Sequence, residues 1–286
     1  MIKWVRISVL VENNAKNEKL KKGKGLSMLV ETENINGEKT KILFDTGDSG
    51  EILSHNVATM NIKLNDVDAI VISHGHWDHT GGLLAALDLI GKRTPIILHP
   101  DALLPRVANK PKIRLVGIQF RKEDIEKKGG VLIFNKYAFE LSPGIFVTGE
   151  IARVTDYEEP PKIYFICRDG DLVPDKIFDD QALAIKLADG RGIIVTGCSH
   201  SGIINITKQV KTMLGVKKFA LIIGGFHLIG AKSERIKRTV EDLIKLGAEK
   251  IAPNHCSGEE ILNIVPQDKL IIANAGEIIE IKSKIS

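Results

Sequence analysis

The hydrophobic residues in the first part of the chain are grouped into short runs rich in Val and Ile, bounded by Gly, Asn or Asp. Runs of this kind are typical of β-strands, and we expect strands at residues 5–11, 27–31 and 41–44. The pair Asn36-Gly37 stands between the second and third runs and predicts a tight hairpin turn. We therefore expect the chain to begin with antiparallel strands.

From residue 69 onward, buried-type runs alternate with segments of helical periodicity. Leu83, Leu87 and Ile90 have helical spacing after a strand-like run, and Ser257 with Glu260 forms a capping-box pattern that predicts a late helix. Strands that alternate with helices imply sheets covered on their outer faces. Two such halves packed sheet on sheet would give an α/β fold, a four-layer αββα sandwich of two mixed sheets. The expected strands are 69–72, 95–98, 192–196, 220–223 and 250–252, and the expected helices are 202–214 and 233–246.

The middle of the chain is less regular. Pro105, Pro111, the pair Pro160-Pro161 and Pro174 interrupt it, and long loops in compact domains are often functional. We expect one domain over residues 1–286, with an elaborated loop region around 101–178 that covers the active-site edge.

The overall composition excludes several classes of protein. With 286 residues and 43% hydrophobic content the chain can build a substantial core, and its net charge of only +4, without a basic, aromatic-rich stripe, disfavours a nuclease or other nucleic-acid partner. Three cysteines give no disulfide framework. No apolar segment has the length of a membrane span, and the N-terminal run lacks the long apolar core of a signal peptide. We therefore expect a soluble, cytoplasmic protein with a small-molecule substrate, and the sequence leaves homo-oligomerisation open.

Residues 73–82, SHGHWDHTGG, form the most informative stretch of the sequence. His74 and His76 lie two apart, so in an extended segment both side chains point the same way and can bind one metal ion. Asp78 and His79 follow as the chain turns toward a helix, so they can point elsewhere and hold a second ion. Imidazole and carboxylate are the ligands of catalytic zinc sites.

Histidine also follows three later predicted strands, as His200, His227 and His255. In layered α/β folds the loops that leave the strand ends converge on one edge, so these histidines are expected to meet His74. We expect His227 to line the pocket and to donate a hydrogen bond to a phosphate or oxyanion.

The segment HGHWDH at residues 74–79 resembles the HxHxDH signature of the metallo-β-lactamase superfamily. Residues 44–47, FDTG, resemble that family's early strand end, whose Asp, here Asp45, supports the metal site without binding metal. Residues 253–255, PNH, resemble the late strand end that supplies a ligand to the second metal. The resemblance covers nearly the whole chain and implies the αββα fold with two divalent ions, zinc first and Fe, Mn or Ni as alternatives. The ligands it implies are His74, His76, Asp78, His79 and His255.

The sequence departs from that family's pattern at its bridging carboxylate. The strand GIIVTGCSH at 192–200 carries Cys198 where the family has an Asp, and no His occurs between His99 and His200. We expect His200 to complete the first site. Two alternatives remain open: Cys198 is itself a ligand, or a carboxylate from Asp179, Asp180 or Glu150 replaces the missing Asp.

A narrower resemblance connects the chain to one archaeal and bacterial branch of the superfamily. Segments such as TGCSH at 196–200, GGFHL at 224–228 and HCSG at 255–258 resemble proteins labelled 7,8-dihydropterin-6-yl-methyl-4-(β-D-ribofuranosyl)aminobenzene 5′-phosphate synthase. The main hypothesis is a hydrolase that uses a hydroxide bound by two metals on a small phosphoester or ester, with Asp78 as a catalytic group. The alternatives are a pterin–arylamine ribosyl-phosphate synthase or transferase and a non-catalytic, metal-containing ligand sensor.

Overall fold

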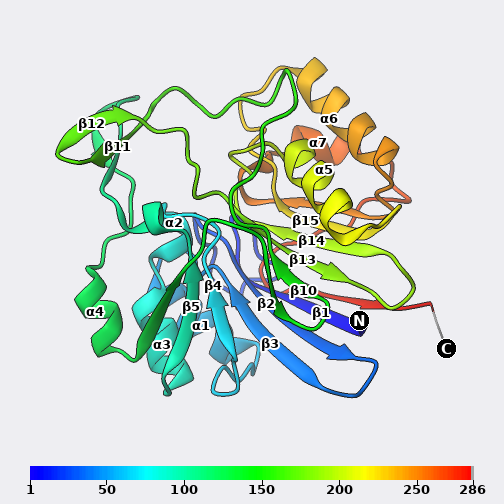
Figure 1. Ribbon diagram of the computed structural model, residues 1–286, viewed down its shortest axis with the longest axis horizontal. Coiled ribbons are helices and arrows are strands. Elements are labelled where there is room, and N and C mark those ends of the chain that lie inside the picture. The colour runs from blue at the N-terminus through cyan, green and yellow to red at the C-terminus, as the bar shows by residue number, and fades with distance from the viewer. Residues whose placement is uncertain (285–286) are drawn as a thin grey trace.

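Two mixed β-sheets form the centre of the molecule, and helices cover their outer faces (Figure 1). The computed structural model describes residues 1–284. The first sheet has the strand order β17-β1-β2-β3-β4-β5-β8, in which β1 to β3 are antiparallel and β3, β4, β5 and β8 are parallel. Its strands are β1 (Ile2–Val11), β2 (Ser27–Asn34), β3 (Lys39–Phe44), β4 (Ala69–Val71), β5 (Thr94–Leu98), β8 (Gly130–Phe134) and β17 (Ile278–Lys282).

The second sheet has the order β16-β15-β14-β13-β10-β9, with β14, β15 and β16 parallel to one another. Its strands are β9 (Phe139–Ser142), β10 (Ile145–Val147), β13 (Ala182–Lys186), β14 (Gly192–Thr196), β15 (Phe219–Gly225) and β16 (Ile251–Asn254). The helices are α1 (Gly50–Thr59), α2 (Trp77–Thr80), α3 (Leu83–Ile90), α4 (Lys122–Lys127), α5 (Ile203–Leu214), α6 (Ser233–Lys245) and α7 (Glu260–Ile264), with short 3₁₀ turns at Pro100–Leu103 and His255–Ser257.

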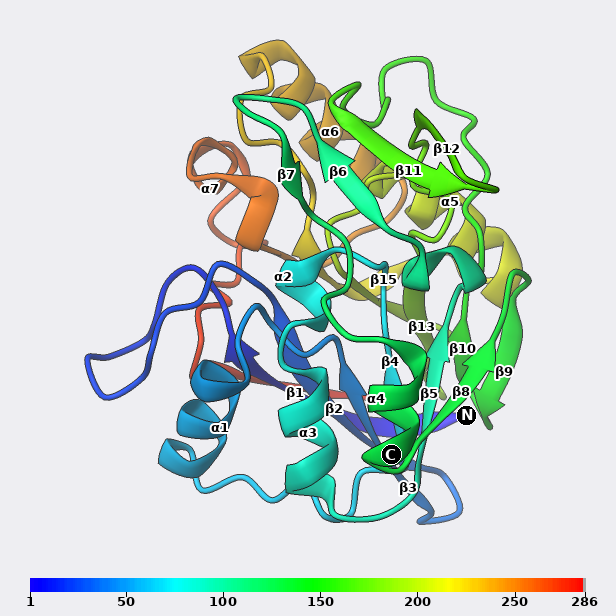
Figure 2. The same cartoon turned by 90° about the vertical axis from the view of Figure 1, so that its left-hand side faces the viewer.

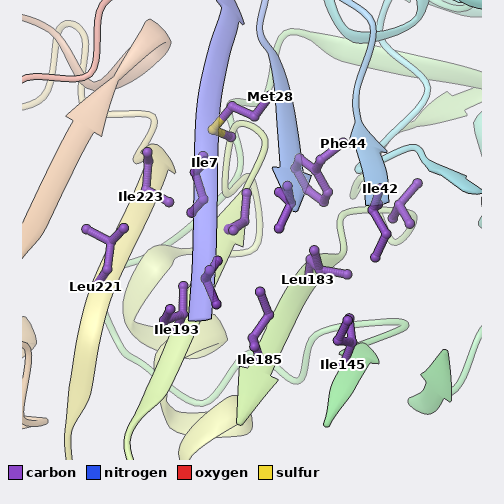
Figure 3. Close-up of a cluster of buried hydrophobic side chains, with 14 of the residues drawn as sticks. Ile7, Met28, Ile42, Phe44, Ile145, Leu183, Ile185, Ile193, Leu221 and Ile223 are labelled. Carbon is purple, nitrogen blue, oxygen red and sulfur yellow. The ribbon is translucent and has the colours of Figure 1, made fainter. Parts of the chain in front are cut away.

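The inner faces of the two sheets bury the central hydrophobic core (Figure 3). Ile7, Met28 and Phe44 of the first sheet face Leu183, Ile193 and other aliphatic side chains of the second sheet. The outer face of the first sheet packs on α1, α3 and α4, and that of the second packs on α5, α6 and α7. Each central strand is therefore buried on both faces, which explains its continuous Val and Ile content. The four-layer αββα prediction is confirmed.

Most of the predicted elements are present, and one local prediction is wrong. The Asn36-Gly37 turn joins β2 and β3 as an antiparallel hairpin, with Gly37 at φ +84°. Ser257, however, does not cap a helix. It lies in the 3₁₀ turn after β16, and its hydroxyl accepts a hydrogen bond from the amide of Phe226. The Ser257 hydroxyl therefore takes part in a tertiary contact and not in a helix cap, and α7 begins at Glu260 without a side-chain cap.

The region 101–178 is more ordered than the sequence suggests. β8 extends the first sheet, and β9 and β10 extend the second. The remaining strands, β6 (Arg106–Ala108), β7 (Arg114–Leu115), β11 (Tyr164–Arg168) and β12 (Asp171–Pro174), form a separate small sheet that lies above α2 in Figure 2. Within region 101–178, this small sheet lies at the edge where the strand ends meet, with Tyr164 of β11 beside His76. Among residues 1–284, no helix combines the length and apolar character needed to cross a membrane.

Candidate metal centre

Four strand ends deliver histidines to one point between the two sheets. His74 follows β4, His200 follows β14, His227 follows β15 and His255 follows β16. The ring centres of His74 and His200 are 4.8 Å apart, and those of His200 and His227 are 4.3 Å apart. The structure therefore brings together histidines separated by more than a hundred residues, as the strand-end argument predicts.

Two groups of potential ligands stand side by side at this point. In the first, His74 and His200 have ring nitrogens within 4.8 Å of the Cys198 thiol, and His74 Nε2 lies 2.9 Å from His76 Nδ1. In the second, His79 Nε2 is 3.2 Å from Cys198 Sγ, and His255 Nε2 is 3.5 Å from Asp78 Oδ2. The HxHxDH segment thus divides its side chains between two positions.

Cys198 is the side chain that the groups share. Each cluster of ligand atoms among residues 1–284 that lies within 4.8 Å includes its sulfur, and a third such cluster combines it with His227 and Cys256. The thiol therefore stands where a single atom could contact two ions at once. Cys256 was missed in the sequence, although it directly follows His255 in the segment HCSG.

The donor set fits a pair of transition-metal ions. His76 Nε2, His255 Nε2 and both ring nitrogens of His200 are buried and have no hydrogen-bond partner. Buried polar atoms are rarely left unpaired, so these nitrogens call for a ligand at the centre of the cluster. Imidazole, thiolate and carboxylate together suit zinc and neighbouring metals.

The electrostatics of the centre keep the imidazoles of His74, His76 and His200 neutral. Burial and the neighbouring histidines hold the pKa of His74 and of His200 well below the usual value, and burial with Arg106 lowers the pKa of His76 to about 3. His79 differs, because the carboxylates of Asp45 and Asp78 outweigh its burial and raise its pKa to about 9. Neutral imidazole is the form that binds metal.

Comparison with known proteins agrees with this geometry. Residues 20–202 match the family model described as the metallo-beta-lactamase superfamily. The chain belongs to the metallo-beta-lactamase superfamily. Its αββα sandwich and its histidine-rich strand ends are those that the sequence resemblance implied.

Three relatives of this superfamily member are informative. This chain is 40% identical to a 7,8-dihydropterin-6-methyl-4-(beta-D-ribofuranosyl)-aminobenzene-5'-phosphate synthase of Methanocaldococcus jannaschii. The alignment spans 249 residues and covers 85% of this chain and 84% of that relative. This chain is 35% identical over 280 residues to an uncharacterised protein of the same organism, covering 96% of this chain and all of that one. The crystal structure of Tm1679, a metal-dependent hydrolase of the beta-lactamase superfamily, superposes with a TM-score of 0.81 at 27% identity, covering 98% of this chain and all of that one.

In this metallo-beta-lactamase site, Asp45 forms a hydrogen bond with His79, one of the candidate ligands. Its Oδ2 lies 2.7 Å from His79 Nδ1, and its two oxygens also accept hydrogen bonds from the amide and hydroxyl of Ser73. Because a carboxylate can only accept, Nδ1 of His79 carries a proton, and its Nε2, which faces Cys198, is the nitrogen that would give up its proton to bind metal. The position fits the expected supporting role.

Replacing Asp45 with asparagine should weaken binding at the second metal position by about 10- to 100-fold, because the amide no longer fixes the tautomer of His79. Metal titration of the purified variant would measure this. Asp68→Asn is a matched control. Asp68 lies in the loop before β4, and its carboxylate also accepts a hydrogen bond, from the backbone amide of Lys41 in β3. Equal metal affinity in D45N and wild type would contradict the role assigned to Asp45.

His255 is positioned by residues that sequence reasoning missed. Its Nδ1 lies 3.1 Å from Asn13 Oδ1, and its backbone amide donates to the buried carboxylate of Glu12. Both partners follow β1, some 240 residues earlier in the chain, and neither belongs to a recognisable motif. They turn the Nε2 of His255 toward Asp78.

Several residues at the centre have a left-handed backbone, which is unusual for residues other than glycine. The φ angles are +56° at Asp45, +57° at Ser199, +49° at His227 and +50° at His255. Such conformations cost free energy and cluster at functional sites. Here they turn the chain sharply after β3, β14, β15 and β16, so that side chains can reach the gap between the sheets.

The carboxylates considered as replacements for a bridging Asp have other partners. Asp179 pairs with Arg106, Asp180 accepts from the amide and hydroxyl of Ser201, and Glu150 lies 2.9 Å from His99 Nε2. None joins a ligand cluster among residues 1–284. The geometry therefore favours Cys198 over these carboxylates.

The small sheet closes the centre from above. The ring of Tyr164 lies 4.9 Å from that of His76 and 5.8 Å from that of His200. The amide of Trp77 also donates to the carbonyl of Val116, beside β7. On the other side, a cavity of about 650 Å³ adjoins His255. This cavity offers a small molecule a place beside His255.

Proposed function

We propose that the chain is a metal-dependent enzyme that joins a pterin to an arylamine bearing a ribosyl phosphate. The observation that carries the proposal is the composition of the cavity beside His255. Asparagine amides line much of it: Asn13, Asn14, Asn254, Asn263 and Asn274. Amide groups offer paired donors and acceptors, which suit the amide and amine edge of a pterin ring. The 40% identity to the Methanocaldococcus synthase supports the same substrate class.

His74, His76 and His200 would hold one ion, and Asp78, His79 and His255 the other, with Cys198 between them. When bound, the ions supply Lewis acidity that stabilises negative charge as it develops on a leaving group or carbonyl oxygen. The site-residue assignments follow from ligand type and placement.

The residues of the chain have separate tasks in this reaction. Asp78 is one-fifth exposed and ionised, because His79 and His255 hold its pKa below the usual range despite burial. It would accept the proton of the arylamine nitrogen as that nitrogen bonds to the methylene carbon of the pterin. The carbon–oxygen bond to a phosphorylated leaving group breaks in the same step. His227, whose Nδ1 is buried without a partner, would donate to the departing oxygen.

A metal-dependent hydrolase is the second candidate, favoured by the 27% identity with Tm1679 over nearly the whole of both chains. The same centre would serve, with water in place of the arylamine and a phosphoester or ester as substrate. A nuclease is not supported by the modest net charge of +4.

Replacing His76 with alanine should lower turnover by at least about 100-fold, because it removes a ligand, and even the partners of ligands are worth about 10- to 100-fold. Two assays of the metal-loaded protein separate the candidates: adduct formation from a phosphorylated hydroxymethyl-dihydropterin and a ribosyl-phosphate aniline, and hydrolysis of bis-p-nitrophenyl phosphate. The activity that is lost in H76A identifies the reaction.

His55→Ala is the matched control, because His55 lies in α1, its ring forms a hydrogen bond with the carbonyl of Lys19, and it belongs to none of the ligand clusters among residues 1–284. If H76A turned over either substrate as fast as wild type does, the proposed metal centre would be refuted. Tight binding of the pterin without turnover in either assay would instead indicate a ligand sensor.

A further inference from the structure

Arg153, in the loop after β10, is a partly buried cation without an anionic partner. One of its terminal nitrogens donates to the carbonyls of Lys176 and Ile177. Its Nε is buried and has no hydrogen-bond partner, and it forms no ion pair within residues 1–284. Burial lowers the pKa of its guanidinium by more than the nearby carboxylates of Asp180 and Asp175 raise it, so its charge is only partly compensated.

The other buried arginine of this region is arranged in the opposite way. Arg106 lies fully buried between two carboxylates, with Nε 2.7 Å from Asp175 and Nη2 2.6 Å from Asp179. A buried charge normally has such partners, because removing it from water costs several kcal/mol. Of these two arginines, Arg106 has its counter-ions within the protein, whereas Arg153 forms no ion pair among residues 1–284.

Arg153 borders a cleft that carries further uncompensated positive charge. Cavities of about 630 and 410 Å³ adjoin one another there and share Lys136 and Lys176 in their linings. Within the described part of the chain neither lysine forms an ion pair. Glu150 also lines both cavities, but its carboxylate lies 2.9 Å from His99 Nε2. Asp101 and Asp175 line the smaller cavity as well, and they pair with Arg168 and Arg106. The cleft thus presents three cations that form no ion pair within residues 1–284, and each carboxylate in its lining already has a partner.

The cleft also has aromatic walls. The guanidinium of Arg153 lies 5.4 Å from the ring centre of Phe178, whose side chain is 45% exposed. Tyr137, which lines the larger cavity, is 84% exposed. Exposed rings beside an unpaired guanidinium offer a surface for a planar or sugar group attached to an anion.

We propose that this cleft binds a phosphate monoester, with its phosphate on Arg153, Lys136 and Lys176 and its organic part against Phe178 and Tyr137. A guanidinium with free N–H groups matches the oxygens of a phosphate, and the two lysines add charge. The phosphate oxygens would give the buried Nε of Arg153 the acceptor that it lacks.

The cleft is separate from the metal centre, although they share a wall. Residues 175–180 form that wall. Asp179 accepts from the amide of Gly75 and Asp180 from Ser201 on the metal side, whereas Lys176 and Phe178 line the cleft. A ligand in the cleft therefore does not need the metal ligands, and the proposal does not rest on the proposed reaction.

The test is calorimetric titration of the metal-loaded protein with inorganic phosphate and with ribose 5-phosphate. Arg153→Met should weaken the binding of both by about 10- to 100-fold, the range for losing a charged hydrogen-bond partner, and should leave the metal content unchanged. Arg238→Met is the matched control, because Arg238 also stacks on an aromatic ring, 3.9 Å from that of Tyr157, but has Asp156 as its partner. It should bind both probes like wild type.

Unchanged affinity in R153M, or an equal loss in R238M, would overturn the proposal. If R153M does not fold, the double variant K136Q/K176Q gives the same test on exposed side chains and should also lose affinity. Tighter binding of ribose 5-phosphate than of phosphate, lost in Phe178→Ala, would identify a sugar phosphate as the ligand. Equal binding of the two probes in wild type would identify the free anion.

Discussion

Replacing Cys198 with serine should remove the thiolate-to-metal absorption of the cobalt-loaded protein and weaken metal retention by about 100-fold or more. The sulfur belongs to every ligand cluster found among residues 1–284, so its loss affects both metal positions at once. A serine hydroxyl is a harder and much less acidic donor than a thiol and cannot replace it at neutral pH. Near-ultraviolet absorption and metal analysis after dialysis would measure the two effects.

Cys167→Ser is the control for this experiment. Cys167 lies in β11 and belongs to none of those ligand clusters, so its variant should keep both the absorption and the metal. Cys256→Ser separates the remaining thiol, which shares only the third cluster with His227. Absorption that survives in C198S but disappears in C256S would show that Cys256, not Cys198, is the thiolate ligand.

Replacing Arg106 with methionine should lower the free energy of unfolding by about 3–5 kcal/mol, because two buried carboxylates lose the cation that pairs with both of them. Asp175 and Asp179 are both at least nine-tenths buried and both bind Arg106. Asp179 in turn accepts from the amide of Gly75, inside the HxHxDH segment. Urea unfolding of the variant would give the difference, and the same variant should also bind metal more weakly.

Arg121→Met provides the comparison on the surface. Arg121 pairs with Asp124 at the start of α4, with its side chain 77% exposed, so its loss should cost no more than about 1 kcal/mol. If R106M unfolds at the same urea concentration as R121M, the ion pairs of Arg106 with Asp175 and Asp179 do not contribute the predicted stability.

The sequence predicts which side chains gather at the candidate metal centre, because their positions follow from local patterns. One short segment, HGHWDH, contains His74, His76, Asp78 and His79, and its spacing indicates metal binding. His200 and His255 each follow an apolar run that predicts a strand. The strand-end rule then brings them together without knowledge of any side-chain contact.

The residues that support the ligands could not be predicted in the same way. Asn13 reaches His255 across 242 positions, and Tyr164 covers His76 from a separate small sheet. Such contacts depend on the conformations of the loops at the edge of the sheets, and the hydrophobic periodicity of the sequence does not predict loop conformations. The Ser257 pattern failed for the same reason, since its hydroxyl binds the amide of Phe226 in the neighbouring strand end instead of starting a helix.

The small sheet over the metal ligands also determines how quickly the centre can exchange its ions. His74, His76 and His200 are almost fully buried, and Tyr164 lies over the rings of His76 and His200, so we expect an ion or chelator to reach them when Tyr164 and the strands around it move away. The rate of metal loss to a chelator should therefore reach a plateau as the chelator concentration rises, at the rate of this opening. Stopped-flow measurement of metal release would show the plateau, whereas a rate that stays proportional to chelator concentration would mean that the centre is open. A metal acquired during folding would then be held by a barrier to escape as well as by affinity.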